Sequence, residues 1–160
     1  MKKILIALDY NPSAEKVAET GYEFAKALGA FVTLLHVKAQ PLYYYVGEYT
    51  PIMGYAGLSN AEFAELLSAD KITKEAQDFL DSSKNHLNDD SIQTIVGEGE
   101  ASDCIIETAK NIGADYIVMG SHCRKGLDKL LMGSLAEKVL HYTTVPIFII
   151  PTRDKENGNK

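Results

Sequence analysis

The stretch that decides the fold is residues 117–135, IVMGSHCRKGLDKLLMGSL, because it joins the end of a strand, a loop and the start of a helix. The apolar, β-branched run 115–119 predicts a buried parallel strand, and Gly120 is expected to end it. Gly133 then precedes Ser134 and a helical pattern. A loop that ends at a helix N-terminus offers backbone N–H groups and a positive dipole, so this stretch suits a phosphate or another anion.

A second interpretation of the same residues involves no ligand. In that interpretation Gly120 is a turn that ends a strand, and Ser134 caps a helix through its hydroxyl group. Residues 117–135 taken alone fit both interpretations equally. The order of the elements around them therefore has to separate the two.

The rest of the chain alternates strand patterns with helix patterns. Short apolar runs predict strands at 3–8, 31–37, 92–96, 115–119 and from Val145 to Ile150. Apolar residues that recur every three or four positions predict helices at about 12–28, 59–86, 105–112 and 134–141. Gly29 is expected to stop the first helix in a left-handed conformation. Pro146 is tolerable mainly in an edge strand.

Five strands alternating with four helices predict an α/β fold, a doubly wound and mostly parallel five-stranded sheet with helices on both faces. We expect a single domain over residues 1–151 and a flexible tail over 152–160. Ligands of such sheets bind outside the carboxyl ends of the strands, where the strand order reverses. If the first strand is central and lies beside the fourth, Asp9 and Gly120 meet at that crevice, with Val37 nearby.

Composition excludes several classes of protein. The formal net charge of -6 argues against a surface that binds nucleic acid. No apolar run is long enough for a membrane span, and the N-terminus does not resemble a signal peptide, so we expect a cytoplasmic protein. In that reducing compartment Cys104 and Cys123 would remain thiols. No metal site built from protein side chains is expected, because the four histidines lack ligand spacing.

Residues 38–58 follow no period and are rich in tyrosine, with interspersed proline and glycine. A loop of this length in a compact domain is usually functional or disordered, and the many aromatic residues argue against simple disorder. Two interpretations of this segment stay open. In the first it has a structural role, as a cover over the core or as a dimer contact. In the second it is a lid over a ligand.

Taken in this order, the residues resemble the universal stress protein family from Lys3 to Ile150. The resemblance is carried by Asp9 after the first strand, by LLHV at 34–37, by the motifs within 113–122, and by Gly126 before Gly133-Ser134. It implies an adenine nucleotide alpha hydrolase-like fold with strand order 3-2-1-4-5. It also implies a homodimer, often paired through the last strand, here Val145 to Ile150.

The nucleotide-binding branch of this family wraps the phosphates of ATP with glycine, two residues, glycine, nine residues, and then Gly-Ser or Gly-Thr. Gly120, Gly133 and Ser134 match that frame, and Cys123 stands where the second glycine belongs. The resemblance implies adenine contacts, ribose contacts and phosphate contacts, with Mg²⁺ or Mn²⁺ carried by the phosphates. The implied adenine contacts are Asp9 and Val37, with Ala7 and Leu8 lining the pocket. The implied ribose contacts are Met119 and Gly120. The implied phosphate contacts are the backbone at Cys123 together with Gly133, Ser134 and Leu135.

Cys123 is the main departure from the family pattern. If position 123 needs a left-handed backbone, its Cβ costs roughly 1 to 2 kcal/mol, or about tenfold in affinity, whereas an ordinary backbone costs little. Two interpretations of the cations Arg124, Lys125 and Lys129 stay open. They offset part of that loss in affinity, or they are loop charges that only contact solvent. A reactive thiol at Cys123 is a further interpretation.

Three functions follow from these residues. The first is a dimeric universal stress protein that binds ATP as a stress-response sensor or regulator, with at most slow hydrolysis. The second is a dimeric interaction module that has lost nucleotide binding. The third, an enzyme that turns over a nucleotide in the same crevice, is disfavoured because no catalytic base is evident.

Overall fold

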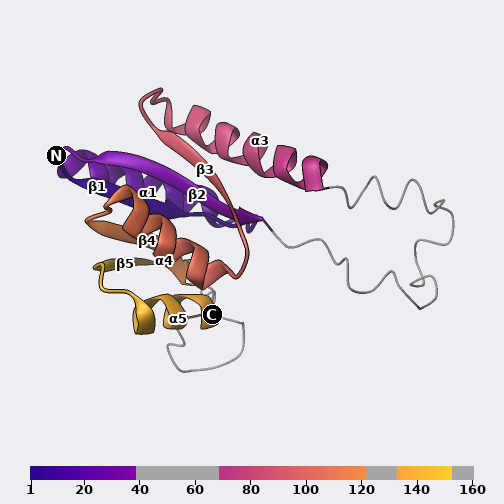
Figure 1. Cartoon of the computed structure of the whole chain (residues 1–160). Helices are drawn as coiled ribbons and strands as arrows, with labels where there is room; N and C mark the ends of the chain where they lie inside the picture. Colours follow the sequence, from indigo (N-terminus) through magenta and orange to yellow (C-terminus); the bar gives the residue numbers. More distant parts are fainter. Residues whose placement is uncertain (39–68, 122–132, 153–160) are drawn as a thin grey trace, which may run out of the picture.

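A computed structural model describes residues 1–38, 69–121 and 133–152 and shows a five-stranded sheet with the order β3-β2-β1-β4-β5 (Figure 1). All four pairings between neighbouring strands are parallel. The strands are β1 (Lys3–Ala7), β2 (Phe31–Lys38), β3 (Gln93–Glu98), β4 (Tyr116–Ser121) and β5 (Ile147–Pro151). The predicted fold class and strand order are therefore confirmed.

Helices cover both faces of the sheet (Figure 1). The described helices are α1 (Ala14–Ala27), α3 (Ala69–Leu87), α4 (Ala101–Ile112) and α5 (Ser134–Tyr142). Buried residues of α1 and α3 form one core cluster with Ile4 and Ile6, and buried residues of α4 and α5 form a second cluster with Leu5. Alternate side chains of β1 thus enter opposite cores, as a central parallel strand requires. None of the helices in the described residues is long and apolar enough to cross a membrane.

Glycine allows α1 to approach the sheet closely. A Cβ atom on Gly21 would lie 2.9 Å from Cδ1 of Ile6 and 3.0 Å from Cγ1 of Val118. Gly29 and Gly113 follow α1 and α4 with φ of 58° and 65°, so the left-handed helix stop predicted at Gly29 is confirmed.

Several predicted boundaries were wrong. Gly120 does not end the fourth strand, because β4 continues to Ser121 and pairs with the end of β5. The first helix, predicted from about residue 12, begins at Ala14 with Ser13 as N-cap. The Ala14 N–H donates to the Asn11 carbonyl, so residues 11–13 form a turn before the helix. β5 begins after Pro146 and lies at the edge of the sheet, the position expected for a strand with proline.

The helix predicted at about 105–112 begins four residues earlier, at Ala101. The remaining ends shift by one or two residues, which is the usual uncertainty of helix and strand termini. The first strand ends at Ala7, the second at Lys38, the third spans 93–98, and the last helix ends at Tyr142. The predicted helix start at Ser59, the tyrosine-rich segment from residue 39 onward, Cys123 and residues 153–160 lie outside the described residues.

Candidate functional site

A cavity of about 300 Å³ lies at the carboxyl ends of β1, β2 and β4. The N-terminal turns of α1, α4 and α5 complete its wall. Nine of the ten residues predicted to contact a ligand line this cavity, and the tenth, Cys123, lies outside the described part of the chain. The nine are Ala7, Leu8, Asp9, Val37, Met119, Gly120, Gly133, Ser134 and Leu135.

Sheet pairing sets the position of these residues. Ala7 at the end of β1 is in register with Leu35 on one side and Met119 on the other. The Leu8 N–H donates to the Leu35 carbonyl over 2.8 Å, so pairing continues one residue beyond β1. The expected meeting of the first and fourth strand ends is therefore present.

One wall of the cavity is apolar. Leu35 and Met119 are buried, and Ala7, Val37 and Leu135 pack against the same core cluster from partly exposed positions. Such a wall suits a flat, apolar ring, because small-molecule pockets are mostly apolar with a few oriented polar groups.

Asp9 combines a cavity position with a local structural contact. Its carboxylate accepts hydrogen bonds from the Asn11 backbone N–H at 3.2 Å and from Asn11 Nδ2 at 2.6 Å. This contact shapes the turn between β1 and α1, a structural role that aspartate side chains often have in turns. Asp9 also lines the cavity, so its position is compatible with both a turn contact and a ligand contact.

The N-termini of α4 and α5 at the cavity differ in electrostatics. At α4 the Glu100 carboxylate already accepts the Asp103 N–H at 3.1 Å and a hydrogen bond from the Ser102 hydroxyl. These bonds and Lys138, whose Nζ is 3.4 Å away, hold the pKa of Glu100 at about 2. The N-terminus of α4 therefore already carries an anion.

At α5 the arrangement is different. The N-cap residue is Gly133, which has no side chain to accept a hydrogen bond from the first turn of the helix. Ser134 is the first helical residue. The interpretation in which Ser134 caps the helix is therefore wrong. The first N–H groups of a helix lack intrahelical partners, and here they adjoin the cavity, so α5 rather than α4 is suited to receive an external anion.

His36 was not among the predicted ligand contacts, although it lines the cavity. It is 4% exposed, and its Nδ1 donates to the Leu8 carbonyl over 2.9 Å. Its Nε2 is buried and has no hydrogen-bond partner in the described structure. The signal available in the sequence was its position within a continuous apolar strand, where a polar side chain must be buried.

Comparison with known proteins places the chain in a family. A model described as the Universal stress protein family matches residues 1–151. Universal stress protein MJ0577 of Methanocaldococcus jannaschii is 29% identical over 157 residues, covering 96% of each chain. Universal stress protein A homolog 2 of Coxiella burnetii is 33% identical over 141 residues, covering 88% of each.

Solved structures agree with this result. The structure of MJ0577 matches with a TM-score of 0.70 and 27% identity, covering 96% of this chain and 97% of that one. Two others, each 19% identical, share the fold. The universal stress protein of Archaeoglobus fulgidus in complex with dAMP matches with a TM-score of 0.60, covering 93% of this chain and 97% of that one. A universal stress protein in complex with cAMP matches with a TM-score of 0.57, covering 95% of this chain and 98% of that one. The chain belongs to the universal stress protein family.

Proposed function

We propose that the protein binds an adenine nucleotide, ATP, in the cavity at the ends of β1 and β4, and acts as a stress-response sensor or regulator. The observation that carries the proposal is the position of the α5 N-terminus against an apolar cavity wall. The adenine ring would contact Asp9 and Val37, with Ala7 and Leu8 lining its pocket. Family members in complex with dAMP and with cAMP support the choice of an adenine nucleotide.

The remaining assignments follow the strand ends. Met119 and Gly120 would contact the ribose, and the backbone at Gly133, Ser134 and Leu135 would hold phosphate oxygens. Cys123 would contribute its backbone N–H. Among the described residues that line the cavity, Asp9 is the only carboxylate, and it is bonded to Asn11. A Mg²⁺ or Mn²⁺ ion would therefore be held mainly by the phosphates.

We assign at most slow hydrolysis. A general base must lie within hydrogen-bond reach of the attacking water and be available to take its proton. Of the described titratable side chains at the cavity, Asp9 is engaged by Asn11. Nε2 is the basic nitrogen of His36, because Nδ1 donates to Leu8, and it is buried within a side chain that is only 4% exposed. The proposed role is therefore nucleotide-dependent regulation in the cytoplasm.

We also propose that the protein is a homodimer paired through its last strand, within Val145 to Ile150. β5 is an edge strand, and Phe148 on it is 37% exposed. Unpaired strand edges favour association with another chain. This observation also supports the second function, a dimeric interaction module without nucleotide binding, and the nucleotide titration separates the two.

Titration calorimetry with ATP tests the proposal. The wild-type protein is expected to give saturable heat. Ser134→Ala should weaken binding by about tenfold if the Ser134 hydroxyl adds one good contact to a phosphate, and Gly133→Ala should weaken it because its added Cβ lies at the cavity beside the phosphate position. Ser82→Ala is the matched control, because Ser82 is exposed on α3 away from this cavity. Absence of heat at about millimolar ATP would reject nucleotide binding and leave the interaction module.

A further inference from the structure

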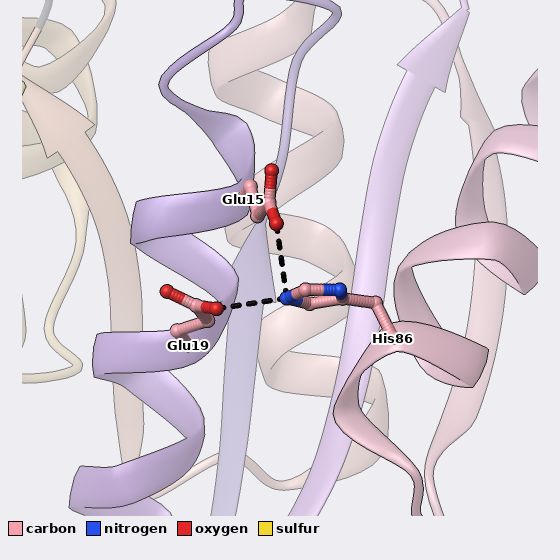
Figure 2. A group of neighbouring side chains, drawn as sticks. All are labelled: Glu15, Glu19 and His86. Atoms are coloured by element: carbon pink, nitrogen blue, oxygen red, sulfur yellow. Dashed lines mark hydrogen bonds and ion pairs between the residues drawn. The ribbon is translucent and has the colours of Figure 1, made fainter.

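Three charged or titratable side chains converge between α1 and α3, outside the nucleotide cavity (Figure 2). Nε2 of His86 lies 3.1 Å from Oε1 of Glu15 and 2.8 Å from Oε1 of Glu19. One donor atom from each side chain lies within 4.8 Å of the other two. Figure 2 shows the imidazole of α3 pointing at both carboxylates of α1.

The fold explains this convergence. Glu15 and Glu19 are four residues apart, so they share one face of α1, while Val17, Ala18 and Gly21 are buried toward the sheet. His86 lies in the last turn of α3, which packs on the same face of the sheet. Two carboxylates at this spacing repel one another weakly, and a positive charge placed between them removes that repulsion.

We propose that Glu15, Glu19 and His86 form a binding site for a divalent transition-metal ion of the Zn²⁺ class. Around a tetrahedral ion with bonds of about 2.1 Å, neighbouring donor atoms lie about 3.4 Å apart. The two distances from His86 Nε2, 3.1 Å and 2.8 Å, are shorter than that value, so the exposed side chains would rotate slightly apart to admit an ion. One nitrogen and two carboxylate oxygens then leave a coordination position for water.

The donor set selects the ion. Imidazole favours Zn²⁺, Ni²⁺ and Cu²⁺, whereas Mg²⁺ and Ca²⁺ take oxygen ligands almost exclusively. The side chains of Glu15, Glu19 and His86 are 65%, 51% and 44% exposed, so an ion has a path from solvent. A second cavity of about 280 Å³ is lined by Glu15 and His86 together with Asn11, Ser82 and Ser83, among others. Its polar rim gives room for water molecules bound to the ion.

Without an ion, a proton can occupy the same position. The hydrogen bond to Glu19 and the charges of both glutamates raise the pKa of His86, which is the behaviour of an imidazolium held between carboxylates. Metal and proton therefore compete for Nε2. An ion would join α1 to α3 across 67 residues of sequence, independently of any nucleotide.

Calorimetric titration of chelator-treated full-length protein with Zn²⁺ at about pH 8 tests the site, since protons compete less for an imidazole there than at neutral pH. Saturable binding is expected, and His86→Gln and Glu19→Gln should each weaken it by at least about tenfold. The matched controls are Glu23→Gln, one turn further along α1, and His141→Gln on α5, both exposed and expected to bind as wild type. Mg²⁺ should neither bind nor compete.

A nitrogen NMR spectrum of the wild-type imidazoles needs no variant and locates the ion directly. Zn²⁺ should shift the His86 ring signals and leave those of the buried His36 unchanged. Binding that persists in His86→Gln, His86 signals that do not move on adding Zn²⁺, or equal competition by Mg²⁺ would each overturn the proposal. Because ATP is absent from these measurements, their failure is separate from failure of nucleotide binding.

Discussion

Ala7, the last residue of β1, is the register partner of Met119 near the end of β4, and both line the cavity beside the α5 N-terminus. This pairing fixes the position of the cavity, because it brings the carboxyl ends of β1 and β4 side by side. Leu8 and Asp9, which follow β1, and Gly120, which follows Met119, line the cavity. A longer side chain at Ala7 would enter the space assigned to the adenine ring.

Ala7→Leu is therefore expected to reduce ATP affinity by at least about tenfold, because the isobutyl group occupies the cavity that a base would fill. The thermal midpoint should change little, since position 7 is only partly buried and faces open space. Calorimetry and thermal unfolding measure the two effects. Unchanged affinity in a folded variant would place the base elsewhere.

Gly21→Ala is expected to destabilise the fold despite the better helix propensity of alanine. The propensity gain is about 1 kcal/mol, whereas forcing a Cβ against Ile6 and Val118 costs about 1 to 3 kcal/mol. A net loss of about 1 kcal/mol in the free energy of unfolding should appear in urea denaturation. Glu23→Ala, on the exposed side of α1, is the control and should change stability by less than about 0.5 kcal/mol. Stabilisation by Gly21→Ala would show that the core has room there.

Glu100 is expected to contribute to acid unfolding. Its pKa is about 2 in the folded protein against an ordinary value of 4.5, so the ionised carboxylate stabilises the fold above about pH 4.5. That contribution is lost as the pH falls from 4.5 towards 2.

Glu100→Gln should lower stability at neutral pH and make the decline over this pH range shallower, because glutamine does not ionise. Denaturant unfolding at a series of pH values measures both changes. Glu107→Gln, exposed on α4, serves as control. Parallel acid profiles for wild type and Glu100→Gln would exclude Glu100 as a source of the pH dependence.

Phe148→Lys tests the proposed dimer. A lysine on an edge strand opposes pairing with another strand, so the variant is expected to sediment as a monomer where the wild type is a dimer. Leu28→Lys is the control, since Leu28 is 42% exposed just after α1 rather than on the edge strand. A dimer that persists in Phe148→Lys would mean that the copies associate through another surface.

Much of the fold was predictable from local patterns. The apolar runs at Ile4–Ile6 and around Val118 indicated strands buried on both faces, and Gly29 marked a helix end. The end of β4 was not predictable in this way. Gly120 looks like a strand terminator, but pairing of Gly120 with Ile150 extends the strand, and that contact comes from residues distant in sequence.

The candidate sites differ in the same respect. The nucleotide cavity could be located because parallel strands place their carboxyl ends together, and the motif residues follow those ends. The contacts of individual side chains were less accessible, as His36 shows. The Glu15, Glu19 and His86 cluster was missed altogether, and a side-chain metal site was not expected, because spacing within the sequence says nothing about two helices that meet in the fold.

Nucleotide binding in the cavity is tested most directly by following the backbone amide signals of the protein in nitrogen–proton NMR spectra during titration with ATP. The amides of Gly133, Ser134 and Leu135 should shift together and saturate, because they adjoin the proposed phosphate position. If the amide signals of these three residues stay unchanged at about millimolar ATP, the result contradicts a nucleotide site at the α5 N-terminus, whether or not signals elsewhere in the protein move.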